Sequence, residues 1–253
     1  MIDFFKTLYA FPFACAAWTF LALSGFFAYP YFFVTGFKAG QLRNFIYLQG
    51  KIIQIAIFFA SGFHKKVVRL GDITAPSVLV ANHPCTYDTF VFSSFGIKNH
   101  VGIAKGWPFK IPIYGKYIQK AGYINSDGKT AGEIIALAKQ RLQSGLHISI
   151  FPEGTRSKKT GRFRSLAFET AIKCNAAVVP FAIQGLEEML PPGKWWPKYA
   201  RVTYIQLLPV SPENFSGEAA DLRMAKFVKE LIERQLEVKA CAPVSAAADK
   251  ETA

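Results

Sequence analysis

The sequence predicts an α/β protein, in which a mostly parallel sheet is flanked by helices and preceded by an N-terminal hydrophobic helical membrane anchor. The first observation is that short apolar runs of strand length alternate with helical patterns from about residue 67 onward. Such alternation is typical of parallel sheets covered by helices. The second is that no charged residue lies between Lys6 and Lys38, whereas a bilayer crossing needs only about 20 apolar residues.

The apolar N-terminal run, Thr7–Phe37, is open to two interpretations. Because Pro12 and Pro30 interrupt it, it is expected to form either one tilted span or a broken helix that dips into the bilayer and returns. A second apolar segment, residues 45–63, is short for a span and suits a position in the membrane interface. The alternative for both segments is a buried helical hairpin of a soluble protein. Nearby positive charges favour the cytoplasmic side for the downstream domain: Lys38, Arg43, Lys51, Lys65, Lys66 and Arg69.

The chain is expected to divide into an anchoring segment (1–66), an α/β domain (67–239) and a tail (240–253). The tail is rich in Ala with little to bury, which predicts disorder. The expected strands are Val78–Ala81, Val101–Ala104, Gly122–Ile124, His147–Phe151, Ala177–Ile183 and Arg201–Leu207. The expected helices are Thr89–Phe95, Thr130–Ser144, Ser165–Asn175 and Asp221–Val238.

Local signals mark some of these boundaries. Thr130 and Glu133 have the spacing of a capping box, and Gly145 is a typical helix stop. Pro180 has no N–H to donate to a neighbouring strand, so its strand is expected at a sheet edge, or Pro180 itself at a strand end.

The net charge of +13, from 30 Lys and Arg against 17 Asp and Glu, predicts an anionic partner. The hydrophobic share of 51% is high for a protein that coats nucleic acid, so basic and apolar character together favour a membrane surface. Cys15, Cys85, Cys174 and Cys241 form no C-x-x-C pair and are expected to be free thiols in a reducing compartment.

The central functional candidate is the segment Asn82–Asp88, which follows the apolar run Ser77–Ala81. On one continuous helix, His83 and Asp88 would not share a face, because five residues correspond to about 500° of rotation. A turn at Pro84 removes this objection. With Asp88 in the first turn of the following helix, its carboxylate can fix the tautomer of His83 and stabilise the imidazolium, leaving the other ring nitrogen to take a proton.

Two alternatives compete for the same segment. Thr86 or Asp88 could cap a helix beside a structural turn histidine. Cys85 could be a nucleophile, although the local sequence offers it no separate basic partner.

A second cluster follows the expected strand at residues 147–151. Gly154 permits close backbone approach to a ligand, Glu153 can accept hydrogen bonds from hydroxyls, and Arg156 offers a fork for an anionic group. His83 and Glu153 both follow strand ends, so they are expected to converge. A solvated basic loop is the alternative, since the residues that back Arg156 are Lys158, Lys159, Arg162 and Arg164.

Residues 105–115 are aromatic, basic and rich in turn formers. They are expected to line an acyl groove or to rest on lipid headgroups. A surface loop around a packed Trp is the alternative.

Four segments in this order resemble the sequence blocks of the glycerolipid acyltransferase family, which includes the lysophosphatidic acid acyltransferases. The first runs from His83 to Asp88 with the pattern H-x-x-x-x-D, and the third is Phe151–Ser157, a very specific match. The second and fourth are residues 105–124 and Val179–Pro180. The resemblance covers residues 77–183 and implies a glycerol-3-phosphate acyltransferase-like fold.

The resemblance implies a membrane enzyme of phospholipid biosynthesis that transfers a fatty acyl group from acyl-CoA or acyl carrier protein to the hydroxyl of a lyso-lipid. His83 would be the general base and Asp88 its orienter, with no covalent acyl-enzyme, no metal and no cofactor. The implied substrate-binding residues are Lys105, Glu153, Gly154, Thr155 and Arg156. The implied partners are membrane lipids and the acyl donor, not nucleic acid, and the implied location is the cytoplasmic face of the inner, cytoplasmic membrane.

One position departs from the family pattern. The second block commonly ends in an Ile-Asp-Arg type sequence whose Arg helps to hold the acceptor phosphate, whereas this chain has Asn125 and Ser126. The expected acceptor is 1-acyl-glycerol-3-phosphate, giving phosphatidic acid, with Lys105, Lys110 or Arg156 in compensation. An amino-acid lipid or a larger lysophospholipid is the alternative.

Three other classes of function stay open on the sequence alone. A non-catalytic lipid-binding protein would keep the fold without the Arg. A nucleic-acid binder would account for the charge, although no nucleic-acid motif is present. A hydrolase would use the same His–Asp pair to activate water.

Overall fold

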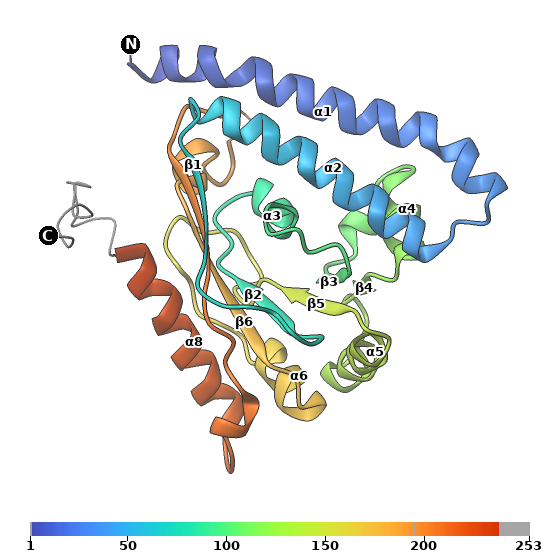
Figure 1. Cartoon of the computed structure of the whole chain (residues 1–253), viewed down its shortest axis with the longest axis vertical. Helices are drawn as coiled ribbons and strands as arrows, with labels where there is room; N and C mark the ends of the chain where they lie inside the picture. Colours follow the sequence, from blue (N-terminus) through green and yellow to red (C-terminus); the bar gives the residue numbers. More distant parts are fainter. Residues whose placement is uncertain (1, 195, 238–253) are drawn as a thin grey trace, which may run out of the picture.

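Seven strands form one sheet in the computed structural model, which describes residues 2–194 and 196–237 (Figure 1). Their order across the sheet is β1-β7-β6-β2-β5-β3-β4. All neighbouring strands run parallel except β6 and β7, which are antiparallel. The predicted mostly parallel α/β sheet is therefore confirmed. The strands are β1 (Lys65–Arg69), β2 (Val78–Ala81), β3 (His100–Ala104), β4 (Ile124–Asn125), β5 (His147–Ile150), β6 (Val178–Gln184) and β7 (Val202–Gln206).

Helices cover both faces of the sheet (Figure 1). One face is covered by α5 (Ala131–Gln143), α6 (Leu166–Cys174) and α8 (Ala220–Glu237). The other is covered by α2 (Ala39–Ala60) and α3 (Val91–Ser94), with α1 (Ile2–Val34) outside α2 and α4 (Tyr114–Ala121) beside it. The short elements are α7 (Leu186–Met189) and the 3-10 helices η1 (Tyr87–Phe90), η2 (Trp107–Lys110) and η3 (Pro212–Asn214).

Strand β2 divides the interior into two cores. Val78 and Val80 pack with residues of α5, α6 and α8, whereas Leu79 and Ala81 pack with residues of α1, α2 and α3. All four side chains are fully buried. A strand buried on both faces forms a continuous apolar run instead of an alternating one. The bounds predicted for β2 from this run agree with those of the structure. Because β2 lies in the middle of the sheet, its carboxyl end opens at the centre of one sheet edge.

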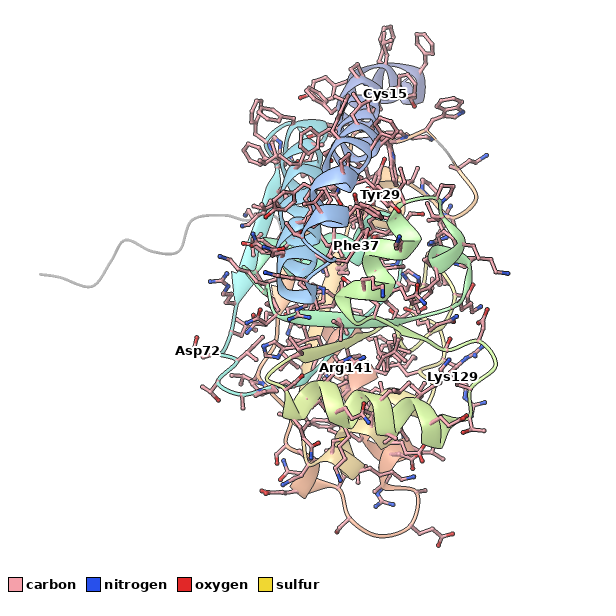
Figure 2. All side chains as sticks on the ribbon, turned by 90° about the vertical axis from the view of Figure 1, so that its right-hand side faces the viewer. Cys15, Tyr29, Phe37, Asp72, Lys129 and Arg141 are labelled. Carbon is pink, nitrogen blue, oxygen red and sulfur yellow. The ribbon has the colours of Figure 1, made fainter. Side chains whose placement is uncertain are left out.

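Helix α1 is continuous through Pro12 and Pro30, so the single-helix interpretation holds over the broken one. Among the described residues, one helix, Phe4–Val34, is long and apolar enough to span a membrane, and only 17% of its most apolar window is buried. Figure 2 shows ring side chains gathered around this helix near Cys15, at the top of the view.

Helix α2 runs alongside α1 and packs its inner face on the α/β domain (Figure 1). Gly50 lies so close to Ser93 of α3 that the space holds no Cβ. One turn later, the Gln54 Nε2 donates to the Phe90 carbonyl at 3.0 Å. Helix α2 therefore supports the segment that follows His83, whereas the interfacial position expected for residues 45–63 stays a prediction.

Most of the expected helices are present with small shifts at their ends. Thr130 caps α5, and the reciprocal bonds with Glu133 form the predicted capping box. The expected helix at 89–95 forms η1 followed by α3. The expected helix at 221–238 is α8, and Val238 lies outside the described residues, as does the tail predicted at 240–253.

The position of Pro180 is a correction to the prediction. Its strand, β6, lies between β7 and β2 and not at a sheet edge, and Pro180 is within the strand. The missing N–H is tolerated because the regular pairing of β7 ends where Gln206 meets Phe181. Beyond that point the Pro180 carbonyl still accepts from Leu207 N–H at 2.9 Å, so the ladder continues without a donor from Pro180.

Strand β1 and helix α4 are among the elements that were not predicted. Strand β1 is a charged, mostly exposed edge strand with no apolar alternation. It crosses the boundary expected between residues 66 and 67, and the division into anchor and domain stays a prediction. Helix α4 begins at the end of the segment 105–115, which was interpreted as turn-rich because Pro112 and Gly115 flank the start of the helix. Gly115 packs directly on the Phe109 backbone, which leaves no room for a Cβ.

Candidate active site

The carboxyl ends of β2 and β5 lie side by side and bring two sequence motifs together. Val80 pairs with Ile150 in parallel, so the turns after both strands open at the same sheet edge. The backbone N–H of His83 donates to Glu153 Oε1 at 2.9 Å. In return, the Ser157 N–H donates to the His83 carbonyl at 3.1 Å. The first and third blocks therefore form one site.

Asp88 holds the imidazole of His83. His83 Nδ1 lies 2.8 Å from Asp88 Oδ2, which also accepts the Cys85 N–H at 2.9 Å. Asp88 reaches this place from 3-10 helix η1, after the turn at Pro84, and is fully buried. A carboxylate can only accept, so Nδ1 carries the proton and Nε2 is left as the basic nitrogen. The His83 side chain keeps 14% of its surface exposed.

The charge of Asp88 depends on a few close partners. Burial raises the pKa of the Asp88 carboxyl, because the charged form loses its hydration. The hydrogen bond and charge of His83, the Cys85 N–H and the positive charge of Arg156 act in the opposite direction on this pKa. Among the groups that favour the ionised form of Asp88, His83 has the largest effect, and an ionised Asp88 in return stabilises the imidazolium that forms when Nε2 takes a proton.

Phe151 fixes the face of the same ring. Its ring stacks on the imidazole of His83, with centroids 4.4 Å apart and planes at 23°. Together with the Asp88 bond at the ring edge, this contact leaves the imidazole one orientation. This contact could not be predicted from the sequence, because a Phe at a strand end does not show which ring it will contact.

Glu153 is a bridge between two turns. Its Oε1 accepts the His83 N–H, and its Oε2 accepts the Gly161 N–H at 2.8 Å. The residue is only 5% exposed. Burial raises the pKa of the Glu153 carboxyl, while both backbone N–H groups and the charge of His83 oppose the rise. Where the sequence indicated an acceptor for substrate hydroxyls, the structure shows a carboxylate that orders the backbone of the site.

Replacing Glu153 by Gln tests this role. The amide can accept from one of the two backbone N–H groups, but its NH2 then faces the other. We expect the free energy of unfolding to fall by about 1–3 kcal/mol, because buried donors are left unpaired. Chemical denaturation measures the effect. The control Glu169→Gln, which removes an exposed pair with Lys173, should cost less than about 1 kcal/mol. Equal stability of the two variants would contradict the bridge.

Asn82 is a site residue that the sequence did not reveal. Its side chain is buried, and its Nδ2 donates to the Ile183 carbonyl at 2.9 Å while its Oδ1 accepts the Ile183 N–H at 2.8 Å. This pair of bonds fastens the end of β2 to β6 just before His83. The available signal was an Asn between a buried strand and the motif, where a polar side chain must satisfy backbone groups.

The remaining predicted substrate-binding residues surround the pair unevenly. Gly154 adopts φ +67 and packs against the Arg164 guanidinium. Thr155 and Lys105 are exposed. The Arg156 guanidinium lies 5.9 Å from the centre of the Trp107 ring, and its charge acts on Asp88. Arg156 is therefore the cation that the structure brings nearest to the His–Asp pair among these residues.

Ser126 is hydrogen-bonded to the backbone of β3 through both its side chain and its N–H. Its Oγ donates to the Ala104 carbonyl at 3.1 Å and its N–H to the same carbonyl at 2.9 Å. The position that commonly carries an Arg in the family is thus folded back onto β3.

Cys85 is buried beneath the turn. Its Sγ accepts the Tyr87 N–H at 3.2 Å. Burial and the nearby charge of Asp88 raise the pKa of the Cys85 thiol, which disfavours the thiolate that nucleophilic attack requires. Cys15, Cys85 and Cys174 are free thiols, and Cys241 lies outside the described residues.

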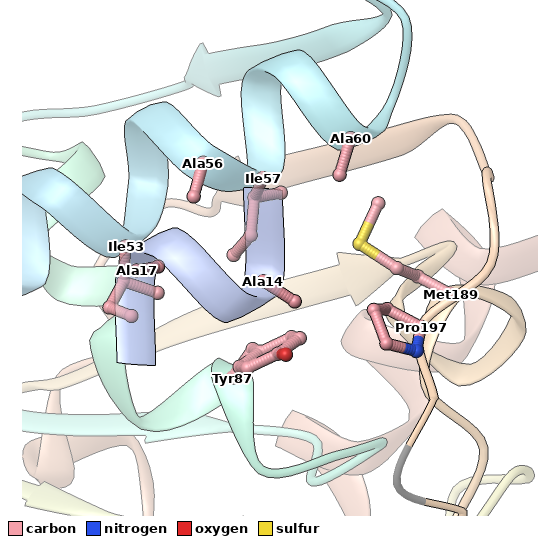
Figure 3. Close-up of a pocket in the computed structure, with 9 residues that line it drawn as sticks. All are labelled: Ala14, Ala17, Ile53, Ala56, Ile57, Ala60, Tyr87, Met189 and Pro197. Carbon is pink, nitrogen blue, oxygen red and sulfur yellow. The ribbon is translucent and has the colours of Figure 1, made fainter. Parts of the chain in front are cut away.

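A small apolar pocket lies between α1, α2 and η1, and neither His83 nor Asp88 lines it (Figure 3). Figure 3 shows Tyr87, the neighbour of Asp88, on one side and Ile57 and Met189 on others. Trp18 of α1 donates from Nε1 to the Tyr87 hydroxyl at 3.3 Å. The apolar N-terminal helix therefore reaches to within one residue of Asp88. This connection between anchor and site was not visible in the sequence.

Comparison with known proteins agrees with this geometry. Residues 64–184 match the family model described as Acyltransferase. A chloroplastic 1-acyl-sn-glycerol-3-phosphate acyltransferase of Arabidopsis thaliana is 33% identical over 123 residues, 47% of this chain and 34% of that protein. A 1-acyl-sn-glycerol-3-phosphate acyltransferase of Helicobacter pylori is 31% identical over 114 residues, 44% of this chain and 47% of that protein. The match thus spans about a third to a half of these curated relatives.

The similarity to a solved structure extends further along the chain. The crystal structure of the 1-acyl-sn-glycerophosphate acyltransferase of Thermotoga maritima superposes with a TM-score of 0.64 at 25% identity, covering 90% of this chain and 98% of that one. The fold and the His83–Asp88 pair at the ends of the strands thus define an acyltransferase domain. Residues 64–184 are thus similar to the acyltransferase family model, and the matched proteins are glycerolipid acyltransferases by name.

Proposed function

We propose that this chain is a membrane-bound O-acyltransferase that transfers a fatty acyl group from an acyl thioester to the free hydroxyl of a lyso-lipid. The observation that carries the proposal is the 2.8 Å pair between His83 Nδ1 and the buried Asp88 Oδ2. The pair leaves Nε2 as the basic nitrogen of a partly exposed imidazole. The apolar helix α1 contacts Tyr87, the residue before Asp88, through Trp18, and a base close to an apolar helix suits an acceptor that has a hydroxyl and a hydrocarbon chain.

The proposed reaction is a single displacement. His83 Nε2 takes the proton from the lipid hydroxyl, and the oxygen attacks the thioester carbonyl to form a tetrahedral intermediate. Asp88 stabilises the imidazolium during this step. The intermediate collapses, the carbon–sulfur bond breaks, and the imidazolium returns its proton to the departing thiolate. Base and orienter are side chains of this chain, and we propose no metal and no cofactor. Acyl-CoA or acyl carrier protein is the donor substrate.

The proposed acceptor is 1-acyl-glycerol-3-phosphate. Arg156 supports it, since its guanidinium offers a bidentate site for a phosphate close to the His–Asp pair. The relatives named as 1-acyl-sn-glycerol-3-phosphate acyltransferases point the same way. Ser126 favours a second candidate, because it holds the Ala104 carbonyl and offers no charge to a phosphate. That candidate is another lyso-lipid, such as an amino-acid lipid or a larger lysophospholipid.

The proposed location is the inner membrane with the catalytic domain on the cytoplasmic face. The apolar helix α1 supports membrane attachment. The basic residues that follow it support the cytoplasmic side.

A panel of acceptors tests the proposal. Purified full-length protein is incubated with labelled acyl-CoA or acyl carrier protein and, in turn, with 1-acyl-glycerol-3-phosphate, larger lysophospholipids and amino-acid lyso-lipids. We expect the highest kcat/KM with the glycerol-phosphate acceptor, and Arg156→Gln should lower it about tenfold or more through the loss of a charged hydrogen bond. A preference for an acceptor without the phosphomonoester would favour the second candidate. Release of free fatty acid without an acceptor would indicate a hydrolase.

A further inference from the structure

A polar pocket outside the candidate active site lies between α2, η1, α3, β3 and α4. Figure 1 shows α4 beside the first half of α2, the part of α2 that lines the pocket. The volume of the pocket is about 60 Å³. A single water needs about 10–15 Å³, so the pocket has room for a group of several atoms. His83, Asp88 and Arg156 do not line it, and it is therefore a site of its own.

Two cations and no carboxylate line this pocket among the described residues. The cations are Arg43 of α2 and Lys98, just before β3. The Lys98 ammonium lies 5.5 Å from the centre of the Tyr47 ring, and that of Lys51 lies 5.7 Å from the same centre. Because Tyr47 also lines the pocket, Lys51 adds a third positive charge next to it. A surplus of positive charge around a pocket favours a negatively charged ligand.

The Arg43 guanidinium is held in place but is not fully paired. Its Nη1 donates to the Ala121 carbonyl at the end of α4 at 3.0 Å. Its Nε is buried and has no hydrogen-bond partner among the described residues, although buried polar groups are rarely left unpaired. Burial and the charge of Arg141 lower the pKa of Arg43, as expected for a guanidinium without a nearby carboxylate. An anion in the pocket would supply the missing negative charge and a further acceptor.

Hydroxyl groups add further donors to the lining. Ser93 of α3, Tyr114 of α4 and Tyr123, just before β4, all line the pocket. Burial raises the pKa of the Tyr114 phenol to about 12 and also raises that of Tyr123, so both phenols keep the proton that they can donate. Neighbouring glycines make room for this lining, because a Cβ on Gly50 would collide with Ser93 and one on Gly102 would crowd Tyr123. The donors come from several elements, which suits a tetrahedral anion better than a planar one.

We propose that this pocket binds a phosphate group, either free phosphate or the phosphate of a phospholipid headgroup. Arg43 and Lys98 supply the positive charge, and charged donors form the stronger hydrogen bonds to phosphate. The hydroxyls of Ser93, Tyr114 and Tyr123 are the additional donors.

The bound phosphate lies against the element that carries Asp88. Thr89 and Phe90 of η1 line the pocket together with residues of α2 and α4. The ligand therefore connects α2 and α4 to η1, and it stabilises the folded protein because it binds the native state. The inference goes beyond the proposed function and does not depend on it, since neither the His83–Asp88 pair nor Arg156 is part of this site.

Thermal unfolding of the full-length protein in a neutral detergent tests the inference without turnover. Arg156 is proposed to hold a phosphate in the active site, so the starting protein carries Arg156→Gln. The dependence of Tm on the phosphate concentration gives the Kd. At about ten times this Kd, we expect inorganic phosphate to raise Tm by about 3–6 °C relative to chloride at equal ionic strength.

Two substitutions added to Arg156→Gln locate the binding. Lys98→Gln removes an exposed cation from the lining, so it should keep the fold and raise the Kd about tenfold through the loss of a charged contact. Arg43→Gln should raise the Kd at least as much, but it also loses the bond to Ala121 and should lower Tm without ligand. Lys120→Gln is the matched control, because Lys120 is an exposed lysine of α4 that does not line the pocket. An equal Kd in Lys98→Gln and Lys120→Gln would overturn the proposal.

A second probe identifies the source of the phosphate group. Dihexanoyl phosphatidylglycerol, a water-soluble phospholipid, replaces inorganic phosphate in the same measurement. A Lys98-dependent rise in Tm with the lipid alone assigns the site to a headgroup, and a rise with inorganic phosphate assigns it to free phosphate. The absence of a Lys98-dependent rise with both probes overturns the inference, even if acyl transfer is observed. A Lys98-dependent rise in a protein that shows no transfer upholds the inference and rejects the proposed function.

Discussion

Replacing His83 by Ala is expected to reduce acyl transfer by about 10²–10⁴-fold, the range typical of a general base. Asp88 holds the edge of the imidazole, and Phe151 stacks on its face. The substitution therefore removes the nitrogen, His83 Nε2, that is proposed to take the proton from the acceptor hydroxyl. The rate is measured with saturating acyl donor and lyso-lipid acceptor in mixed micelles. A loss smaller than about tenfold would contradict the role of base.

Removing the ring also leaves the buried charge of Asp88 without its main partner, so stability must be separated from chemistry. His83→Asn keeps an N–H that can donate to Asp88 Oδ2, and it should fold better than His83→Ala while remaining inactive. His64→Ala is the matched control, because His64 is an exposed histidine that contacts Tyr199. It should retain full activity. Membrane flotation of all three variants shows whether α1 still attaches the protein.

The local geometry of the site could be predicted from the sequence, because it depends on residues that are close together in the chain. The turn at Pro84 lies between His83 and Asp88, and the apolar run before Asn82 identifies a buried strand. Residues that act through local chain direction could therefore be placed. The strand that carries the third block could be placed for the same reason, and parallel pairing brings both ends together.

The sequence did not contain contacts between distant segments. Glu153 was interpreted as a ligand for hydroxyls, because nothing in a sequence shows that the backbone N–H groups of His83 and Gly161 will occupy its two oxygens. Asn82 and Ile183 are 101 residues apart, and only the fold brings the Asn82 side chain to the Ile183 backbone.

Pro180 shows a different limit of sequence-based prediction. The rule that Pro avoids inner strands does not take into account where the neighbouring strand ends. A Pro in a regular inner strand loses a ladder hydrogen bond. Here Pro180 pairs in register with Val80 of β2, but the register with β7 ends at Gln206, so the missing N–H falls on a side where the regular ladder has ended. The position of Pro180 was therefore decided by where β7 ends, which the sequence around Pro180 does not show.

Replacing Asp88 by Asn is expected to lower kcat by about 10²–10⁴-fold, mainly through loss of charge. The amide oxygen can take the place of Oδ2 and still accept from His83 Nδ1 and the Cys85 N–H. The tautomer is then preserved, but the imidazolium that forms during proton transfer has lost its counter-ion. The acid limb of the pH–rate profile should accordingly move to lower pH.

The pH–rate profile of this variant tests how Asp88 acts. If Asp88 merely capped η1, Asp88→Asn would leave the acid limb in place and lower only stability, because an Asn caps a helix nearly as well as an Asp. The exposed Asp72 provides the control, since Asp72→Asn removes the same charge from a connecting segment outside the candidate site. Its rate and its pH profile should match those of the unmodified chain. In an acid–base pair the carboxylate must be charged, whereas in a structural turn it needs only to accept hydrogen bonds. The Asp88→Asn variant distinguishes these two roles.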